Sequence, residues 1–243
     1  MASSEQTDRY AIHAAAREGK LNVVESLLNV YIVLADPKSA QRKDDDGRLP
    51  IHWAASSNQP AIVLLLSQQK TFDPDVEDSI GWTPLMIAAS VKDGDAIVDI
   101  LLNRGADVNQ TNHSGQTALH FVASKNNLEL ARKLLANKPP ASSRVKDKRG
   151  QYPLHRAAAI GSTPMVKLLL ENRSPLDTTD IAGYTALHHA VAEGHGDTAI
   201  ALLKAGAATD KRDLDGHLAL DLAPDKAVRK YIEREAENEG IEL

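Results

Sequence analysis

Apolar residues recur at helical spacing in five short segments of the chain. Within each segment they lie three and four positions apart, which places them on one face of a helix. The segments carry Leu21/Val24/Leu27/Leu28, Ile97/Ile100/Leu101, Leu130/Leu134/Leu135, Val166/Leu169/Leu170 and Ala199/Leu202/Leu203. Glycine-containing stretches at 103–109 and 205–209 follow two of them and are typical of helix ends. The pattern predicts a series of short amphipathic helices, each with one face to bury.

A glycine recurs along the chain at intervals of 34, 34, 35, 33 and 33 residues. These glycines are Gly47, Gly81, Gly115, Gly150, Gly183 and Gly216. Each precedes a variant of the phrase Thr-Pro-Leu-His, at 49–52, 83–86, 117–120, 152–155, 185–188 and 218–221, and a further copy lies at 10–13. This phrase at this period is the ankyrin signature, a turn followed by two antiparallel helices.

The repeats predict an all-α fold, an ankyrin-repeat solenoid of seven helix-turn-helix units with β-hairpin-like tips. One unit cannot bury its apolar face alone, so the units must stack into a single domain spanning 1–243. The expected units are approximately 8–43, 44–77, 78–111, 112–146, 147–179, 180–212 and 213–243. About five extra residues near 30–40 predict a longer loop, and one extra residue within 90–94 lengthens the third helix–helix turn. The degenerate last unit is interpreted as a polar cap rather than an acidic interaction tail.

Several recurring letters have a structural role that the repeat itself explains. An aspartate shortly before five of the six glycines is suited to start a tight turn, and the glycine adopts backbone angles that other residues avoid. These aspartates are Asp44, Asp78, Asp147, Asp180 and Asp213. Threonines 83, 117 and 185 are expected helix N-caps, and prolines 50, 84 and 153 the first helical residues. The repeated histidines at 13, 52, 120, 155 and 188 are interpreted as scaffold residues that bond within and between units.

Composition narrows the function classes further. Apolar residues make up 42% of the chain but aromatic residues only 4%, which suits cores of Leu, Val and Ala. The chain has no cysteine, which excludes disulfides, thiolate zinc sites and cysteine nucleophiles. A net charge of −5 does not favour binding to nucleic acid. Residues 1–10 lack the apolar core of a signal peptide and no apolar run is long enough to span a membrane, so we expect a soluble cytoplasmic and nuclear protein.

Three patterns suggest chemistry, and each has a simpler interpretation. The segment 194–199 fits a dinucleotide fingerprint, but a helix is predicted before it where that fingerprint needs a strand. His188, His189 and His195 suggest a metal, yet adjacent helical residues point in different directions and His188 belongs to the scaffold. The basic run at 144–149 contains an aspartate and lacks flanking aromatics, which favours a solvated hairpin edge. We therefore expect no enzyme activity, metal, cofactor or small-molecule substrate.

Specificity is expected on a concave strip formed by the hairpins and the first helix of each unit, at positions that the scaffold leaves free. The candidate partner-binding residues are Asp45, Asp46, Arg48, Trp82, His113, Lys125, Lys148, Arg149, Arg156, Tyr184, Glu193 and Asp215. Mixed charge on this strip favours a protein partner with the complementary pattern, bound by a monomer. Trp82 and Tyr184 follow their glycines and are candidate anchors, although Trp82 also suits packing on the neighbouring hairpin.

Non-scaffold residues extend the resemblance beyond ankyrin repeats in general. They include His-Trp at 52–53, Gly-Trp at 81–82, Ser-Lys-Asn at 124–126 and His-Arg-Ala-Ala at 155–158. The stretches 44–53, 146–148 and 192–197 match as well, so that the similarity runs nearly end to end with seven repeats in register. On these residues the chain resembles the gankyrin family, especially its fungal members.

The resemblance implies an assembly chaperone of the proteasome regulatory particle. Such proteins hold the C-terminal domain of one AAA ATPase subunit in the concave face and hinder premature docking on the core particle. By resemblance, Asp46, Arg48 and Lys125 are charged contacts and Trp82 is the family tryptophan. Ser79 stands at a family acidic position, so that ion pair is not expected here. Without cysteine, the chain lacks the retinoblastoma-binding motif of animal members. The alternative function is a generic ankyrin adaptor or inhibitor in signalling or transcription.

Overall fold

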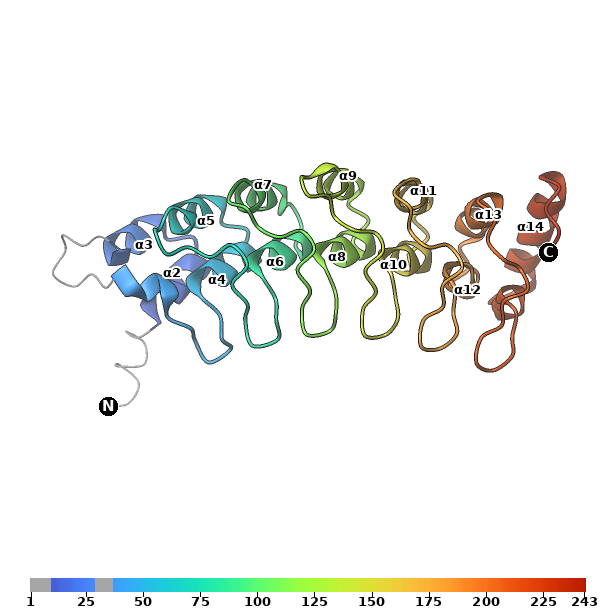
Figure 1. Ribbon diagram of the computed structural model, residues 1–243, viewed down its shortest axis with the longest axis horizontal. Coiled ribbons are helices and arrows are strands. Elements are labelled where there is room, and N and C mark those ends of the chain that lie inside the picture. The colour runs from blue at the N-terminus through green and yellow to red at the C-terminus, as the bar shows by residue number, and fades with distance from the viewer. Residues whose placement is uncertain (1–9, 29–36) are drawn as a thin grey trace. The chain divides into compact units, whose positions relative to one another are not determined.

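A computed structural model describes residues 10–28 and 37–243 of the chain (Figure 1). The expected longer loop near 30–40 falls mostly outside the described residues. The chain divides into two compact units, Met1–His113 and Ser114–Leu243. Each unit consists of short helices arranged in pairs, with a hairpin between one pair and the next. The described part contains helices and one isolated bridge, Arg212 with Leu218, so the all-α prediction is confirmed.

The first unit alternates first and second helices of successive pairs. The first helices are α2 (Ala11–Arg17), α4 (Pro50–Ser56) and α6 (Pro84–Ser90). The second helices are α3 (Leu21–Leu28), α5 (Pro60–Ser67) and α7 (Asp95–Asn103), and a 3-10 helix η1 (Pro37–Gln41) precedes the first described hairpin. Helix α4 packs against both α2 and α6, and α5 packs against α3 and α7, which makes two layers within this unit.

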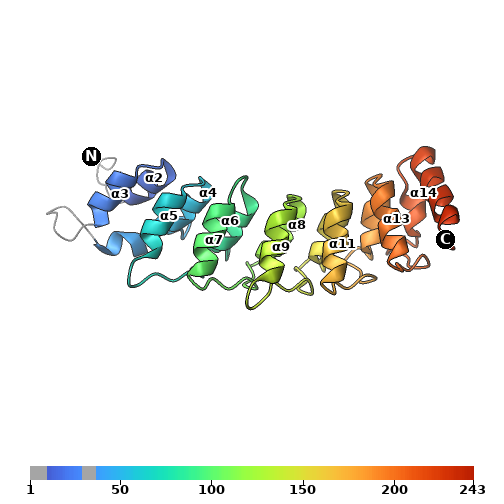
Figure 2. The same ribbon diagram turned by 90° about the horizontal axis from the view of Figure 1, so that it is seen from above.

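The second unit continues the same alternation. Its first helices are α8 (Ala118–Ser124), α10 (Pro153–Ala159) and α12 (Ala186–Ala192), followed by the 3-10 helix η2 (Ala219–Leu222). Its second helices are α9 (Leu128–Ala136), α11 (Thr163–Glu171), α13 (Gly196–Lys204) and α14 (Lys226–Asn238). Figure 2 shows α9, α11, α13 and α14 side by side within this unit, and each packs against the next.

Helix starts follow the residues expected from sequence. Pro50, Pro84 and Pro153 are the first residues of α4, α6 and α10, where a missing N–H leaves no hydrogen bond unmade. The Thr83 hydroxyl accepts a hydrogen bond from the Met86 amide at the start of α6. Thr117 differs, because its Oγ1 lies 3.0 Å from Nδ1 of the His120 ring and accepts no hydrogen bond from a backbone amide of α8. These groups satisfy the free amides of each first turn.

The core of each unit consists of the apolar faces predicted from spacing. Val24, Leu101, Leu134, Val166 and Leu202 are all fully buried. None of the described helices is long and apolar enough to cross a lipid bilayer. The expected extra residue appears as a four-residue turn, 91–94, between α6 and α7, where α4 and α5 are joined by three.

The hairpin aspartates hold the backbone that follows them. Oδ1 of Asp180 accepts hydrogen bonds from the amides of Ala182 and Tyr184, at 2.9 and 3.0 Å. The same pair of bonds, to the second and fourth following amides, occurs at Asp44, Asp78, Asp147 and Asp213. Gly183 completes the turn with φ of +81°, and a Cβ there would lie 2.8 Å from the Leu214 amide nitrogen. The hairpins therefore have one fixed backbone shape and leave their side chains free to vary.

The repeated histidines connect the start of their own helix to the chain segment at the next hairpin. In His52, His120 and His155 the Nδ1 atom accepts a bond from the backbone amide three residues earlier. The Nε2–H donates to a backbone carbonyl at or just before the next hairpin, on Val76, Gln151 and Thr178 respectively. Burial is the largest cause that lowers the pKa of His120 and of His155, to about 4 in each case. These rings are neutral structural groups, as predicted.

The last pair departs from the others as the sequence predicts. The first helix is reduced to the four-residue η2, and α14 is the longest described helix at 13 residues. Asp225 caps α14 by accepting hydrogen bonds from the amides of Ala227 and Val228. Only Ile232 and Ala236 of α14 are buried, and the remaining residues leave a polar outer surface. This helix covers the apolar face of α13 and ends the core.

Candidate protein-binding surface

The hairpins and first helices of each unit form its inner surface, the name used below for that side of each unit. The first unit carries five of the predicted residues: Asp45, Asp46, Arg48, Trp82 and His113. The second unit carries seven: Lys125, Lys148, Arg149, Arg156, Tyr184, Glu193 and Asp215. Within the second unit, Lys125 and Glu193 are the C-cap residues directly after α8 and α12, and Lys148, Arg149 and Asp215 lie on hairpins.

A cluster in the first unit surrounds the ring of Trp53. The Trp53 indole donates to Oδ2 of Asp44 at 2.6 Å, and the guanidinium carbons of Arg17 and Arg48 lie 5.6 and 5.0 Å from the ring centre. Arg48 also donates to Oδ2 of Asp78 at 3.1 Å. Burial acts to raise the pKa of Asp44, but hydrogen bonds from Trp53 and the Arg48 amide outweigh it and hold that pKa below the usual value. Arg48 therefore has a structural role in its ion pair with Asp78, and its side chain is still partly exposed to a partner.

Arg156, like Trp53, donates a hydrogen bond to the carboxylate of its own hairpin aspartate. Its Nη2 lies 2.7 Å from Oδ2 of Asp147, a carboxylate that is 2% exposed. Trp53, Arg156 and His189 each lie nine residues after a hairpin aspartate and each bond its Oδ2. The position that follows the scaffold histidine thus neutralises or satisfies the carboxylate of its own hairpin.

The carboxylate of Asp180 accepts four hydrogen bonds on the inner surface of the second unit. Its Oδ2 accepts from Gln151 at 2.8 Å and from His189 at 3.0 Å. Burial acts to raise the pKa of Asp180. The hydrogen bonds from Gln151 and His189 act in the opposite direction, and together with the backbone bonds they hold the pKa below its usual value. Tyr184 is half-buried beside this group, with its ring 5.5 Å from His188 and 5.4 Å from His189. The tyrosine is held in place by its neighbours, as an anchor requires.

Six predicted charges of the inner surfaces are exposed and form no side-chain hydrogen bond or ion pair in the described part of the chain. They are Asp46 in the first unit and Lys125, Lys148, Arg149, Glu193 and Asp215 in the second. Asp45 accepts a bond from the Tyr10 hydroxyl at 3.0 Å, and His113 lies 3.9 Å from Glu77. Trp82 is half-buried and is engaged with its surroundings. The unpaired charges are the ones best placed to meet a partner, since no internal bond competes for them.

A cleft of about 280 Å³ lies at the start of the first unit. Its lining includes Tyr10, Arg17 and Trp53, together with the consecutive carboxylates of Asp44, Asp45 and Asp46. The cleft is open and its three carboxylates suit a basic side chain of a partner better than a small apolar ligand.

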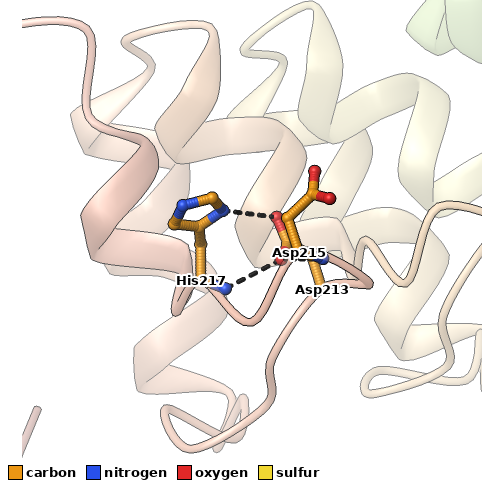
Figure 3. A group of neighbouring side chains, drawn as sticks. All are labelled: Asp213, Asp215 and His217. Carbon is orange, nitrogen blue, oxygen red and sulfur yellow. Dashed lines mark hydrogen bonds and ion pairs between the residues drawn. The ribbon is translucent and has the colours of Figure 1, made fainter.

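Three residues of the last hairpin, Asp213, Asp215 and His217, form the one group among the described residues with the spacing of metal ligands (Figure 3). Oδ1 of Asp213 accepts from the amides of Asp215 and His217, and Oδ2 lies 3.4 Å from Nδ1 of His217. The backbone bonds to Oδ1 occur at every hairpin aspartate; Oδ2 accepts a side-chain hydrogen bond at Asp44, Asp78, Asp147 and Asp180, whereas in Asp213 it has, within the described chain, only the ion pair with His217. The group is therefore explained by the repeat, and His195, which bonds the Ala159 carbonyl, stands apart from it.

Arg48 and Lys125 differ in what they contribute to stability. The sequence suggests that both can be reversed without harm to folding, but Arg48 pairs with Asp78, whose side chain is only 2% exposed. Arg48→Glu is expected to lower the free energy of unfolding by about 3 kcal/mol, because it leaves a buried carboxylate facing a second one. Lys125→Glu should change it by about 0.5 kcal/mol or less. Urea unfolding followed by circular dichroism measures both, and equal midpoints for the two variants would contradict the structural role of Arg48.

Sequence reasoning missed the bonds between one repeat and the next. Arg48 and Gln151 each follow a hairpin glycine and reach the aspartate of the following hairpin, Asp78 and Asp180. The available signal was weak, namely a long polar donor directly after glycine and an aspartate 29 or 30 residues later. It was also obscured because Trp82 and Tyr184 occupy the same position in other repeats.

Comparison with known families agrees with this architecture. Residues 2–78, 68–143 and 122–213 each match the family model of ankyrin repeats in three copies. Among solved structures, the ankyrin repeat domain of Bcl-3, described as a member of the IκB protein family, superimposes with a TM-score of 0.73 and 25% identity. That match covers 91% of this chain and 97% of the Bcl-3 chain. The prediction of an ankyrin-repeat solenoid is confirmed.

Two curated relatives match over most of their length. One is named "Probable 26S proteasome regulatory subunit p28", from Saccharomyces cerevisiae, and is 38% identical over 92% of this chain and 97% of its own. The other is named "Ankyrin repeat-containing protein C6C3.08", from Schizosaccharomyces pombe, and is 41% identical over 86% of this chain and 89% of its own. Both similarities extend across the repeats of the two units rather than over a single shared motif.

Proposed function

We propose that this chain, which belongs to the gankyrin family of ankyrin-repeat proteins, is a non-catalytic chaperone for assembly of the proteasome regulatory particle. It is homologous to a protein named as a proteasome regulatory subunit, and that end-to-end similarity is the observation that carries the proposal. The proposed partner is the C-terminal domain of a proteasomal AAA ATPase subunit. The proposed site of action is the cytoplasm and nucleus, where the protein works as a monomer without nucleotide or metal.

Physical properties of the inner surfaces support a role in binding. Lys125, Lys148 and Arg149 are exposed and unpaired in the second unit, as is Asp46 in the first. Exposed charges of both signs suit a folded protein domain with complementary charge, and they speed encounter more than they strengthen the final complex. A protein of 243 residues bound to one ATPase domain also covers neighbouring surface of the ATPase ring. Its presence alone would therefore hinder docking of the ring on the core particle.

Purified C-terminal domains of the proteasomal AAA ATPase subunits provide the test. We expect one domain to bind the wild-type protein, with Lys125→Glu weakening the complex by about 1–2 kcal/mol and the loss shrinking as salt is raised. Lys204→Glu on α13, a second helix, is the control: Lys204 is a half-exposed lysine whose ion pair in the described part of the chain is with Glu239. Measurement is by calorimetry at two salt concentrations.

Reconstitution tests the mechanism separately from binding. ATPase subcomplexes are mixed with core particles in the presence and absence of saturating wild-type protein. A lower yield of ring–core complexes is expected, and an unchanged yield would refute hindered docking even where binding is confirmed.

A generic ankyrin adaptor or inhibitor in signalling or transcription is the second candidate. The shared scaffold with the Bcl-3 ankyrin domain supports it, since the two folds superimpose along nearly their whole length. The same set of purified domains separates the candidates. Failure of every ATPase domain to bind the wild-type protein would favour the adaptor.

A further inference from the structure

The hairpin tips of the second unit form a ladder that fixes which side chains face outward. The amides of Lys148, Ile181 and Leu214 donate to the carbonyl oxygens of Ser114, Arg149 and Ala182, at 2.8, 3.0 and 3.1 Å. Each bond joins one hairpin to the hairpin before it, and Figure 1 shows these hairpins projecting in the same direction within the unit. Lys148, Ile181 and Leu214 therefore occupy one equivalent position, directly after the hairpin aspartate.

Two of these side chains are apolar and largely open to solvent. Ile181 is 67% exposed and Leu214 is 79% exposed, more than any other large apolar side chain among the described residues. The equivalent residues of earlier hairpins, Ser79 and His113, are polar. Single exposed apolar residues are common, but these two share one position in adjacent hairpins. At this exposure they add nothing to the core.

Charged residues of opposite sign lie on either side of this pair. Lys148 and Arg149 lie on the preceding hairpin, exposed and without a side-chain partner in the described part of the chain. Asp215 follows Leu214, and its exposed carboxylate receives no hydrogen bond there. Along the ladder the tips thus present two cations, then two apolar side chains, then one carboxylate. We call Lys148, Arg149, Ile181, Leu214 and Asp215 the tip row.

We propose that the tip row is a contact site for the same ATPase domain, and that it takes a segment with acidic, apolar and basic side chains in that order. This inference rests on the proposed function and deepens it. The charge pattern identifies the occupant: carboxylates meet Lys148 and Arg149, apolar side chains cover Ile181 and Leu214, and a cation meets Asp215. Apolar residues in the centre with charges at the edges form the usual anatomy of a protein interface.

The test uses the full-length protein and the purified C-terminal domain of each proteasomal AAA ATPase. Ile181→Ser/Leu214→Ser is expected to bind about 10- to 100-fold more weakly than wild type, because two apolar contacts are lost at once. The matched control is Leu64→Ser, which removes a 43% exposed apolar side chain from the second helix α5 and should bind as wild type does. Circular dichroism and thermal unfolding of all variants should coincide, since the substituted residues are exposed.

A charge reversal tests the direction of the segment. Lys148→Glu/Arg149→Glu should weaken binding about 10-fold, and acidic-to-lysine changes in the partner should restore it. If wild type binds an ATPase domain and both tip variants bind it equally well, the tip-row proposal is overturned while the proposed function stands. If no ATPase domain binds wild type, both are overturned.

Discussion

Acidification from about pH 7 to 4.5 is expected to lower the free energy of unfolding of the second unit by about 5 kcal/mol. His120 and His155 cause this loss. Both rings are 1% exposed, and burial lowers the pKa of each from 6.5 to about 4. The unfolded chain takes up a proton on each histidine as the pH falls through 6.5, but the folded chain does not until about 4. Stability is therefore complete above pH 6.5 and is lost progressively between pH 6.5 and 4.

The carboxylates of Asp180 and Asp213 change little in this window. The pKa of Asp180 and that of Asp213 lie below 3.8, because bonds to the carboxylates outweigh the effect of burial. Their contribution is therefore lost only at lower pH, which leaves the histidines as the main cause of the slope. His188 adds in the same direction, since burial lowers its pKa too.

Urea unfolding followed by circular dichroism at a series of pH values measures this slope. Two histidines give at most about 2.7 kcal/mol per pH unit, and His120→Met should remove about half of it. Methionine is a suitable replacement because Met86 occupies the equivalent buried position in the third repeat. A wild-type midpoint that stays constant from pH 7 to 4.5 would contradict neutral, buried histidines.

Repetition explains why the fold was predictable from one sequence. Seven variants of the same phrase constrain one another, so Pro50, Pro84 and Pro153 each indicate a helix start independently. The scaffold role of His52, for example, follows from its phase in the repeat, and its bonds to Leu49 and Val76 bear this out.

The binding surface was less predictable because a charged residue of a hairpin or first helix can either bind a partner or pair with a buried carboxylate of the scaffold. Sequence alone assigns Arg48 and Arg156 to partner binding as surface cations, but each bonds a buried carboxylate 30 residues ahead or nine residues behind. Ile181 and Leu214 escape notice because apolar residues are expected in a core, and sequence spacing does not show that a hairpin tip exposes them. Exposure and pairing are properties of the packed repeats, so periodicity alone does not separate scaffold charges from free ones.

Asp180→Ala is expected to lower the free energy of unfolding by about 4 kcal/mol. The carboxylate accepts four hydrogen bonds, from the amides of Ala182 and Tyr184 and from the side chains of Gln151 and His189. Alanine leaves all four donors without their acceptor. Two of these donors come from the hairpin itself, one from the preceding repeat and one from α12, so the change loosens the stacking of two repeats as well as the turn.

Two further substitutions separate charge from hydrogen bonding at this site. Asp180→Asn retains the oxygen that binds the turn amides, and Asn112 occupies the equivalent buried position in the fourth repeat, so we expect a smaller loss of about 2 kcal/mol. Asp215→Ala removes an exposed carboxylate from a hairpin tip and should cost about 0.5 kcal/mol or less. Urea unfolding measures all three. If Asp180→Ala proves no more destabilising than Asp215→Ala, then the hairpin carboxylates do not hold the repeats together, and the assignment of Arg48 and Arg156 to the scaffold fails with them.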